Sequence, residues 1–485
     1  MASQILFLLN DQTITTAEHP GMLVLDFLRR RAALTGTKEG CKEGDCGACG
    51  VLIGELKDGA VRYKPVTSCL VPLGEMSGKH LVTVEGLNLA HLSLVQEAIV
   101  AEGGTQCGFC TPGIVVSLTG WLMERGAEMD DDDIKYALSG HLCRCTGYNS
   151  LKRAGRSIID GAAQLQNGKN AENKVAAMVT AGMLPEYFLE VPERLTEIQE
   201  QLAVMKPRKS AFKKNTVFIA GGTDIYVQRG DTIPQTPVEL LNRNPEIHGI
   251  READGEVHVG ALTTFEEFAS DTTIQRVIPE IQSFMQLNAS LQIRNRASLG
   301  GNIVNASPIG DMTIFLLALD SRLILKNKEK VRSLPMKKFF LDYKKLDKQP
   351  SEIVTEIIFS TPTPYTKINF EKASKRRYLD IASVNSAICI ETEEDMINKV
   401  NLTVGGVAPI PLFLQEASTF LTGKPIKPEI LEEALIIAQG EISPISDVRG
   451  SIEYKRLLTR QFMIAHFAKL FPEWINLEAF LREIA

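Results

Sequence analysis

The placement of cysteine constrains this chain more than any other feature of its sequence. Eight of the nine cysteines precede residue 146, and three of them lie in one glycine-rich stretch, GTKEGCKEGDCGACG (36–50). The ninth, Cys389, stands alone among alternating apolar residues that predict a β-strand, where a free cysteine is expected to pack as a small buried hydrophobe. For the clustered thiols, a disulfide knot, a zinc site, a redox-reactive thiol and an iron–sulfur cluster are all candidates.

Bulk properties narrow these candidates. A chain of 485 residues is too long for one hydrophobic core and predicts about two to four domains. The net charge of -6 gives no reason to expect nucleic acid or a membrane surface as a partner. The first residues, MASQILFLLNDQTITT, lack the basic start of a signal peptide, and no apolar run is long enough to span a membrane. We therefore expect a cytoplasmic protein with reduced thiols, for which metals are considered before disulfides.

The spacing of the first four cysteines predicts a 2Fe-2S cluster. Cys41, Cys46 and Cys49 form the pattern C-x4-C-x2-C, and Cys69 follows after nineteen residues, as in plant-type ferredoxins. Because such a cluster carries negative charge, its loop must wrap closely and turn backbone N–H groups inward. Four glycines of the loop allow this: Gly40, Gly44, Gly47 and Gly50. A zinc site is more typically built from paired C-x2-C motifs.

The remaining four cysteines form a second set. Cys107 and Cys110 are spaced C-x2-C, Cys143 and Cys145 are spaced C-x-C, and each pair precedes a predicted helix. Two helix N-termini would therefore direct their positive ends toward one anionic cluster. Taken alone, this set also allows a zinc site with four thiolates, because C-x-C is not diagnostic.

The secondary structure predicted from the sequence changes along the chain. Short strand-like segments dominate up to about residue 90, and helical patterns, among them PGIVVSLTGWLMERG and NSLKRAGRSIIDGAAQL, dominate up to about residue 163. The acidic run 130–133 is expected to begin a helix, since its charges complement the helix dipole there. A polar stretch, QNGKNAENK (166–174), predicts a linker, and a large region of mixed strands and helices follows it.

Two later segments suit a polar, phosphate-bearing ligand. VFIAGGTDIYV (217–227) predicts a buried strand that ends in a tight glycine turn, which by itself is more typical of a structural turn. IRNRASLGGNIVNASPIGDM (293–312) places many small hydrogen-bonding residues before an apolar helix. The sequence contains neither GxGxxG nor GxxxxGK[ST], so a Rossmann fold or a nucleotide-triphosphate loop is not supported.

Three motifs together carry a family resemblance. GCKEGDCGACG, QCGFCTPG and HLCRCTGY resemble, in order and separation, the iron–sulfur signatures of the molybdenum hydroxylase family, which includes xanthine dehydrogenase and aldehyde oxidase. The longer form LTGTKEGCKEGDCGACG is most similar to the small subunits of bacterial xanthine dehydrogenases. The resemblance implies that the helical domain's cluster receives electrons first and that the ferredoxin-like cluster relays them to a flavin. It also implies that Gln106 would hydrogen-bond the pterin and that Cys145 lies on the electron path.

The same resemblance implies an FAD site. The two polar segments are similar to the family's two FAD-binding signatures, and FEKASKRRYLDIASVN resembles its loop near the flavin ring. Tyr378 and Leu379 stand where relatives are often more acidic, which leaves only Asp380, so the resemblance does not fix the nicotinamide contacts or the electron acceptor. The residues implied to bind FAD are Ala220, Gly221, Gly222, Thr223, Asp224, Ile225, Ser298, Gly301, Asn302, Asn305, Ser307, Asp311 and Lys372.

The fold class implied is a multidomain α+β protein. Its expected parts are a β-grasp plant-type ferredoxin domain (1–90), an all-α four-helix 2Fe-2S domain (91–163), a linker (164–190), an α+β FAD-binding domain of vanillyl-alcohol-oxidase type (191–362) and a C-terminal α+β subdomain (363–485).

The resemblance also implies that substrate oxidation and electron transfer take place on separate subunits. Two 2Fe-2S clusters and FAD would carry electrons from a molybdopterin centre on a separate, larger subunit to NAD+, in an α2β2 assembly. The expected reaction of the assembly is the hydroxylation of xanthine or hypoxanthine with water, and no catalytic residue is assigned to this chain. Three alternatives remain: a related hydroxylase for aldehydes or other N-heterocycles, a stand-alone iron–sulfur flavin reductase, and a zinc-binding scaffold.

Overall fold

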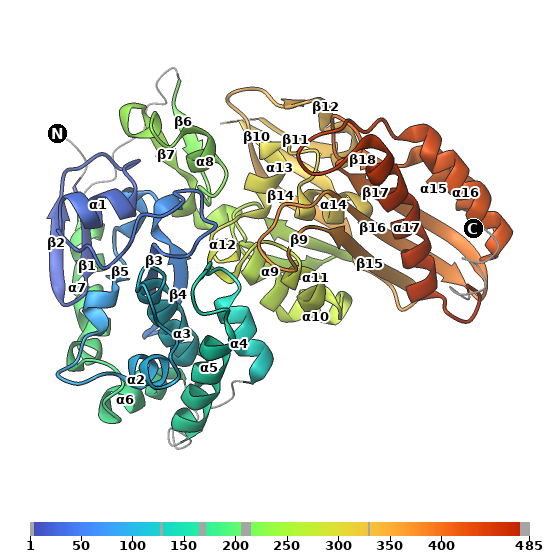
Figure 1. Cartoon of the computed structure of the whole chain (residues 1–485). Coiled ribbons are helices and arrows are strands. Elements are labelled where there is room, and N and C mark those ends of the chain that lie inside the picture. Colours follow the sequence, from blue (N-terminus) through green and yellow to red (C-terminus); the bar gives the residue numbers. More distant parts are fainter. Residues whose placement is uncertain (1–3, 127–129, 164–170, 205–214, 328–329, 476–485) are drawn as a thin grey trace. The chain divides into compact units, whose positions relative to one another are not determined.

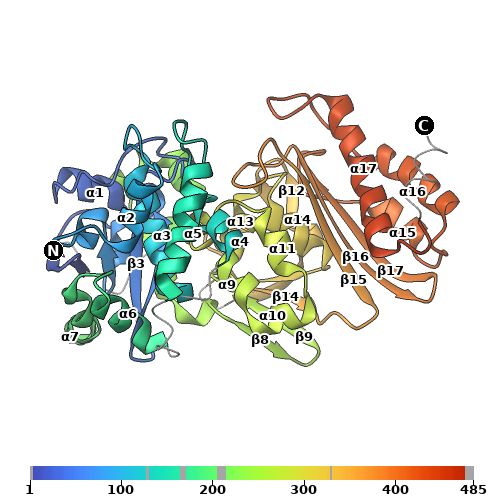
Figure 2. The same cartoon turned by 60° about the horizontal axis from the view of Figure 1, so that its bottom comes forward.

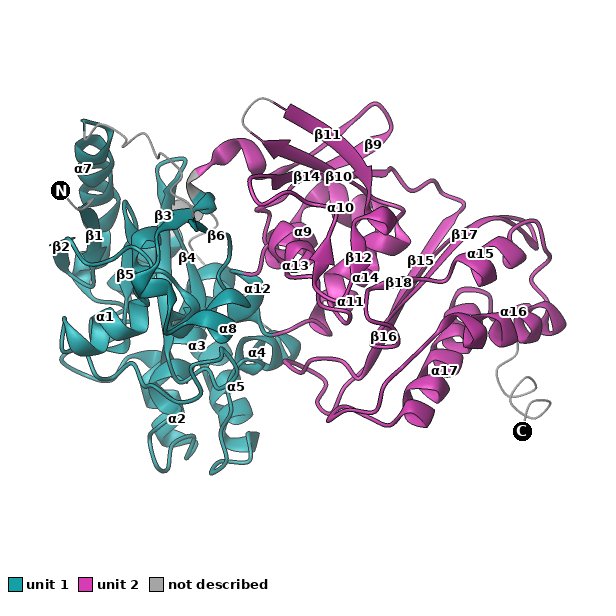
Figure 3. Cartoon of the chain, turned by 90° about the horizontal axis from the view of Figure 1, so that it is seen from above, with its two compact units in different colours: residues 1–243, 290–296 teal, residues 244–289, 297–485 magenta. Residues whose placement is uncertain are grey.

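The protein divides into two compact units, seen here in a computed structural model that describes residues 4–126, 130–163, 171–204, 215–327 and 330–475. One unit contains residues 1–243 and 290–296, and the other contains residues 244–289 and 297–485 (Figure 3). Among the described residues, no helix combines the length and the apolar character needed to cross a membrane.

The first unit begins with a mixed five-stranded sheet (Figure 1). Its strands are β1 (Ile5–Leu9), β2 (Gln12–Thr16), β3 (Gly50–Lys57), β4 (Ala60–Thr67) and β5 (His80–Val82), in the order β2-β1-β5-β3-β4. Strands β1 and β5 are parallel and the other neighbours are antiparallel. Helix α1 (Val24–Arg30) packs Val24, Phe27 and Leu28 against the sheet, which completes the predicted β-grasp fold.

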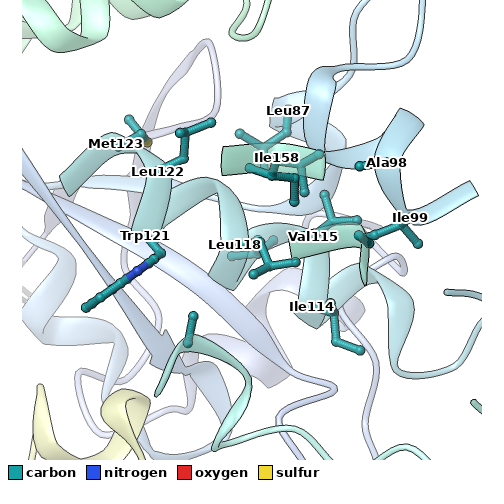
Figure 4. Close-up of a cluster of buried hydrophobic side chains, with 14 of the residues drawn as sticks. Leu87, Ala98, Ile99, Ile114, Val115, Leu118, Trp121, Leu122, Met123 and Ile158 are labelled. Atoms are coloured by element: carbon teal, nitrogen blue, oxygen red, sulfur yellow. The ribbon is translucent and has the colours of Figure 1, made fainter. Parts of the chain in front are cut away.

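Helices dominate the next part of the unit. They are α2 (Leu94–Ala101), α3 (Thr111–Arg125), α4 (Asp131–Leu138) and α5 (Asn149–Ala162), and this confirms the four-helix domain. Figure 4 shows the apolar cluster between them, with Ile114, Leu118 and Ile158 inside. The acidic run does begin a helix, because the Asp130 carboxylate caps α4 by accepting hydrogen bonds from the N–H groups of Asp132 and Asp133.

The predicted linker is partly structured. Residues 164–170 lie outside the described residues, but α6 (Ala171–Thr180) and a 3-10 turn (Glu186–Leu189) follow, so the second part of the linker prediction is wrong. The reason is burial: Met178 and Phe188 are almost fully enclosed in the apolar cluster of the helical domain. Helix α7 (Val191–Val204) then packs Val191 and Leu195 against β1.

The first unit also includes the beginning of the predicted flavin domain. Strands β6 (Val217–Ile219) and β7 (Val238–Leu240) pair in parallel, with helix α8 (Ile225–Arg229) between them in sequence. The apolar residues of these elements form one hydrophobic core with Leu25, Cys49 and Cys69. A short helix, α12 (Leu291–Arg294), belongs to this unit as well.

The second unit contains two larger sheets. The first has the antiparallel order β11-β10-β14-β9-β8, formed by Lys330–Pro335, Arg322–Asn327, Ile353–Ser360, Glu256–Gly260 and Ile250–Ala253. The helices of this part are α9 (Phe265–Ser270), α10 (Thr272–Val277), α11 (Ile281–Gln286), α13 (Leu299–Asn305) and α14 (Asp311–Ala318). A two-stranded hairpin joins β12 (Phe340–Asp342) and β13 (Lys345–Leu346). Every residue of helix α14 after Asp311 is buried, and all of them except Thr313 are apolar.

The second sheet follows the order β15-β16-β17-β18, formed by Thr366–Ala373, Val384–Glu393, Met396–Gly405 and Leu412–Phe413. Helices α15 (Gln415–Leu421), α16 (Pro428–Glu441) and α17 (Ile452–Leu470) share a core with this sheet (Figure 2). Because side chains alternate along a strand, Ile388 and Leu402 face these helices, whereas Asn401 and Thr403 bond the backbone of α14.

Cys389 lies on β16, as the alternating pattern predicted. The residue as a whole is partly buried, so the expected packing as a small buried hydrophobe is met in part. Burial still raises the pKa of the thiol to about 12, which keeps it protonated.

Candidate iron–sulfur and flavin sites

The first four cysteines lie in two thiol pairs. Cys41 and Cys46 stand in the loop that leads into β3, whereas Cys49 precedes that strand directly and Cys69 lies in a 3-10 turn after β4. The hydrogen bond from the Cys46 thiol lowers the pKa of Cys41 to about 5 and raises that of Cys46. In the same way, the Cys69 thiol lowers the pKa of Cys49. In each pair, the pKa of one thiol is thus shifted toward the thiolate, the form that binds iron.

The backbone of this loop favours an anionic group. The N–H groups of Glu43 and Cys46 both donate to Cys41 Sγ at 3.4 Å. At Gly40, a Cβ atom would lie 2.8 Å from Cys46 Sγ, and Gly44 has a φ of +84°, which favours glycine. A 2Fe-2S cluster has four thiolate ligands, two for each iron, and two thiol pairs in a loop of this kind fit it.

The second four cysteines are also paired. Cys107 Sγ and Cys145 Sγ are 3.7 Å apart at an exposed edge, whereas the Cys110 and Cys143 thiols interact in a more enclosed position. Burial raises the pKa of Cys110 to about 12. Helix α3 begins directly after Cys110, so its N-terminus faces the set as predicted. Across the described ranges, no three His, Cys, Asp or Glu side chains converge as ligands of a single metal ion.

Direct contacts join the two cysteine loops. The Leu142 N–H donates a hydrogen bond to the Cys46 carbonyl oxygen at 3.1 Å, and Leu142 immediately precedes Cys143. At Gly113 in α3, a Cβ atom would lie only 2.2 Å from the carbonyl oxygen of Gly47. The close approach of the two loops therefore depends on glycine.

Gln106 lies at the exposed edge of the second set. Its side-chain amide donates to the Cys145 carbonyl oxygen at 3.1 Å. This places the residue implied to contact the pterin beside the cysteine implied to lie on the electron path.

The glycine turn 220–224 follows β6 in the first unit. Gly222 has a φ of +83°, and a Cβ there would lie 2.7 Å from the carbonyl oxygen of Leu70, the neighbour of Cys69. Arg296 donates to the Gly221 carbonyl oxygen at 2.9 Å, and the Tyr226 hydroxyl donates to that of Gly21 at 2.9 Å. The turn is thus attached to the ferredoxin-like domain, and the strand with its glycine turn is confirmed.

The second FAD signature lies in the second unit. Ser298 caps α13 by accepting a hydrogen bond from the Gly301 N–H at 3.2 Å. The Asn302 side-chain oxygen accepts hydrogen bonds from the Thr313 N–H at 3.0 Å and from its hydroxyl at 2.8 Å. These bonds join the helices α13 and α14. Asn305, the last residue of α13, accepts a hydrogen bond from Lys344, and Ser307, which lies between the two helices, accepts one from the Ile309 N–H.

Lys372 and Asp311, both predicted to bind FAD, form an ion pair in the second unit. The Lys372 ammonium, 2 % exposed, lies 2.7 Å from the Asp311 carboxylate and donates to the Leu287 carbonyl oxygen at 2.8 Å. The other Asp311 oxygen accepts a hydrogen bond from the Asn385 amide at 2.6 Å. Sequence reasoning missed Asn385, because nothing in the spacing links a residue on β16 to the start of α14.

The loop after β15 is held by local contacts. Asp380 accepts a hydrogen bond from the Arg376 N–H at 2.9 Å and pairs with its guanidinium, while the Arg377 guanidinium lies 5.6 Å from the Tyr378 ring centre. Leu379 has a φ of +74° and donates to the Ala289 carbonyl oxygen at 3.0 Å. Asp380, the one acid left in this loop, is therefore paired with Arg376.

Known domain families match most of the length of the chain. Four families match: a 2Fe-2S iron-sulfur cluster binding domain (7–73), a [2Fe-2S] binding domain (83–156), an FAD binding domain in molybdopterin dehydrogenase (187–362) and a CO dehydrogenase flavoprotein C-terminal domain (370–470).

Comparison with whole proteins gives distant relatives. Xanthine dehydrogenase 1 of Arabidopsis thaliana is 28% identical over 92% of the chain, xanthine dehydrogenase of Drosophila subobscura 30% over 94%, and aldehyde oxidase 1 of Bos taurus 28% over 96%. The chain spans 38% to 39% of the length of these relatives.

Solved structures also resemble parts of the chain. A carbon monoxide dehydrogenase chain of Hydrogenophaga pseudoflava matches with a TM-score of 0.49 at 25% identity, over 52% of this chain and 88% of that one. Quinoline 2-oxidoreductase of Pseudomonas putida 86 matches with a TM-score of 0.49 at 21% identity, over 56% and 91%. On the four domain matches, together with the paired cysteines, the chain belongs to the molybdenum hydroxylase family and carries its two 2Fe-2S domains and its FAD-binding domain.

Proposed function

We propose that this chain is the electron-transfer subunit of a molybdenum-dependent xanthine dehydrogenase. Electrons from purine oxidation, on a separate molybdopterin subunit, pass through its two clusters and FAD to NAD+. The observation that carries the proposal is the direct hydrogen bond between the two cysteine loops, Leu142 N–H to Cys46 O at 3.1 Å. The purine substrate is supported by the xanthine dehydrogenases among the relatives.

The clusters, when bound, supply one-electron transfer and FAD supplies the two-electron exchange with NAD+. The chain's own residues hold these groups. Two sets of thiolates would bind the clusters: Cys41, Cys46, Cys49 and Cys69, and Cys107, Cys110, Cys143 and Cys145. Backbone N–H groups such as that of Glu43 stabilise the negative charge on sulfur.

The proposed FAD contacts come from three segments. The glycine turn 220–225 would hold the pyrophosphate and ribose, and the polar residues of 298–311 would complete the site. Lys372 would place a positive charge near the flavin. Asp311 and the Leu287 carbonyl oxygen hold its ammonium in position. Gln106 would contact the pterin of the partner.

The proposal extends to assembly, location and domain limits. We infer an α2β2 assembly with the molybdopterin subunit, and the domain limits 1–90, 91–163, 191–362 and 363–485. A cytoplasmic location is supported by the nine cysteines, none of which forms a disulfide.

A related hydroxylase for aldehydes or N-heterocycles is the second candidate. Aldehyde oxidase 1 of Bos taurus is 28% identical over 96% of the chain, as similar as several xanthine dehydrogenases. Substrate residues would lie on the partner, so this chain's sites serve both reactions equally.

The test is purification of the native complex, with iron, acid-labile sulfide, FAD and molybdenum measured per chain. We expect about four irons per chain, since eight thiolates at four per cluster hold two clusters. Xanthine should reduce NAD+ with this complex, and this chain alone should oxidise NADH with artificial acceptors but not purines. A colourless protein without sulfide would overturn the proposal, and turnover of aldehydes instead of xanthine would favour the second candidate.

A further inference from the structure

One short segment connects three parts of the first unit. Residues 290–296 belong to this unit although the residues on both sides belong to the other (Figure 3). The Gln292 amide donates to the Ser117 hydroxyl of the helical domain at 3.0 Å. The Asn295 amide donates to the Pro65 carbonyl oxygen of the ferredoxin-like domain at 2.9 Å. Arg296 makes the third connection, to the glycine turn.

Arg296 bridges two groups with its guanidinium. It pairs with Glu75 of the ferredoxin-like domain, whose side chain is 0 % exposed, and its Nη2 donates to the Gly221 carbonyl oxygen at 2.9 Å. The Arg296 side chain is itself 10 % exposed. Glu75 holds the guanidinium, and the guanidinium holds one peptide group of the turn.

We infer that Arg296 is a positioning residue for FAD, one that orients the phosphate-binding peptide of the glycine turn. The inference rests on the proposed FAD contacts of residues 220–225. A peptide group is planar and trans, so the direction of the Gly221 C=O fixes that of the Gly222 N–H on the opposite side. By holding the carbonyl, Arg296 aims this N–H away from itself, where it can donate to an anionic oxygen.

The stability of the fold does not account for this ion pair. The desolvation of a buried ion pair offsets most of its attraction, and apolar residues of similar size often replace such a pair without loss. Arg296 Nε and Glu75 Oε1 have no partner among the described residues, which makes this pair still less favourable as a stabilising device. A role in fixing the geometry of the turn explains why two charges are buried there.

The glycine turn lies beside a cluster cysteine, so its position bears on electron transfer as well as on FAD binding. Gly222 packs against the carbonyl oxygen of Leu70, the residue after the cluster cysteine Cys69. A turn that moves would change both the affinity for FAD and the distance over which the cluster and the flavin exchange electrons. Arg296 therefore sets both through one hydrogen bond.

The test measures FAD affinity in the full iron-loaded chain. Arg296→Met removes the guanidinium but leaves Glu75 buried and unpaired, so a double variant, Arg296→Met with Glu75→Leu, removes both charges. Arg296→Lys keeps the charge beside Glu75. Asn295→Ala is the matched control, because it removes a connection of the same segment that does not involve the turn. Cluster content is measured by EPR, and amide hydrogen exchange is followed over residues 217–226.

We expect both Met variants to bind FAD at least about tenfold more weakly, which corresponds to about 1.4 kcal/mol. The rate of amide hydrogen exchange should rise over residues 217–226, while the EPR signals of the clusters stay unchanged. Arg296→Lys should recover part of the affinity, and Asn295→Ala should stay within about threefold of the wild type.

Two outcomes overturn the inference alone. Wild-type affinity for FAD in the double variant would show that the turn keeps its conformation without Arg296. An equal loss of FAD affinity in Asn295→Ala would show that residues 290–296 contribute only through their packing in the first unit. If the wild-type chain itself binds no FAD, the proposed function fails as well.

Discussion

The Leu142 N–H donates a hydrogen bond to the Cys46 carbonyl oxygen at 3.1 Å, and this bond links a ligand of one proposed cluster to the neighbour of a ligand of the other. The bonded route between the two proposed clusters runs from Cys143 through one peptide bond to Leu142, and from there across the hydrogen bond to Cys46. The two loops are thereby fixed at short range, as rapid exchange of single electrons between two clusters requires.

Removing this donor should uncouple the clusters. Leu142→Pro deletes the N–H, which should cost about 0.5–1.5 kcal/mol for the lost bond and let the loops separate. The magnetic coupling between the two reduced clusters, measured by EPR, should decrease. Leu142→Ala keeps the N–H and serves as the control, and equal coupling in both variants would contradict the assignment.

Loss of a single ligand should remove one cluster and spare the other. Cys69→Ser or Cys107→Ser should lower the iron content from about four to about two per chain, since each set of four thiolates holds two irons. Iron analysis and visible absorbance measure this. Cys389→Ser should leave the iron content unchanged, because Cys389 lies on β16 of the second unit and belongs to neither set.

The buried pair Lys372–Asp311 should show strong coupling. Lys372→Met leaves the Asp311 carboxylate without its ammonium, 2.7 Å away in the wild type, and breaking such a buried pair costs about 3–5 kcal/mol. Urea unfolding of the FAD-free chain measures this loss. The double variant Lys372→Met with Asp311→Leu should recover most of the stability, but it should not recover FAD binding. Recovery of both would show that the pair serves the fold alone.

His80 should make stability depend on pH. Burial lowers the pKa of this imidazole to about 3, and its ring nitrogens bond the Tyr63 hydroxyl at 2.8 Å and the Asn10 carbonyl oxygen at 2.9 Å. The folded protein therefore holds His80 neutral, whereas the unfolded chain binds a proton near pH 6.5. The contribution to stability is complete above pH 6.5 and falls as the pH drops toward 3, by about 1–2 kcal/mol at pH 5.

The check is urea unfolding at pH 7 and pH 5. His80→Gln retains polar atoms but cannot titrate, so its stability should fall less between the two pH values than that of the wild type. His91→Gln, at an exposed position, is the matched control. An identical fall in the wild type and in His80→Gln would refute the assignment.

Local patterns predicted much of the architecture because they depend on near neighbours in the chain. The spacing of Cys41, Cys46 and Cys49 required a tight glycine-rich loop, and the acidic run at 130–133 marked a helix start through its own side-chain caps. The linker prediction went wrong after residue 170, because the apolar residues that follow the polar stretch, Met178 among them, pack in the helical domain, and such long-range contacts leave no mark on local spacing.

The sequence by itself determined the class of cofactors, two 2Fe-2S clusters and FAD, and it predicted which thiols would form two sets of four and which segments would bind FAD. Only the tertiary structure decided how these parts are connected, since it brought Leu142 to Cys46, Asn385 to Asp311 and Arg296 to Gly221. These contacts join residues far apart in the chain through single hydrogen bonds. Spacing encodes ligand sets, whereas packing alone fixes the directions and distances that electron transfer needs.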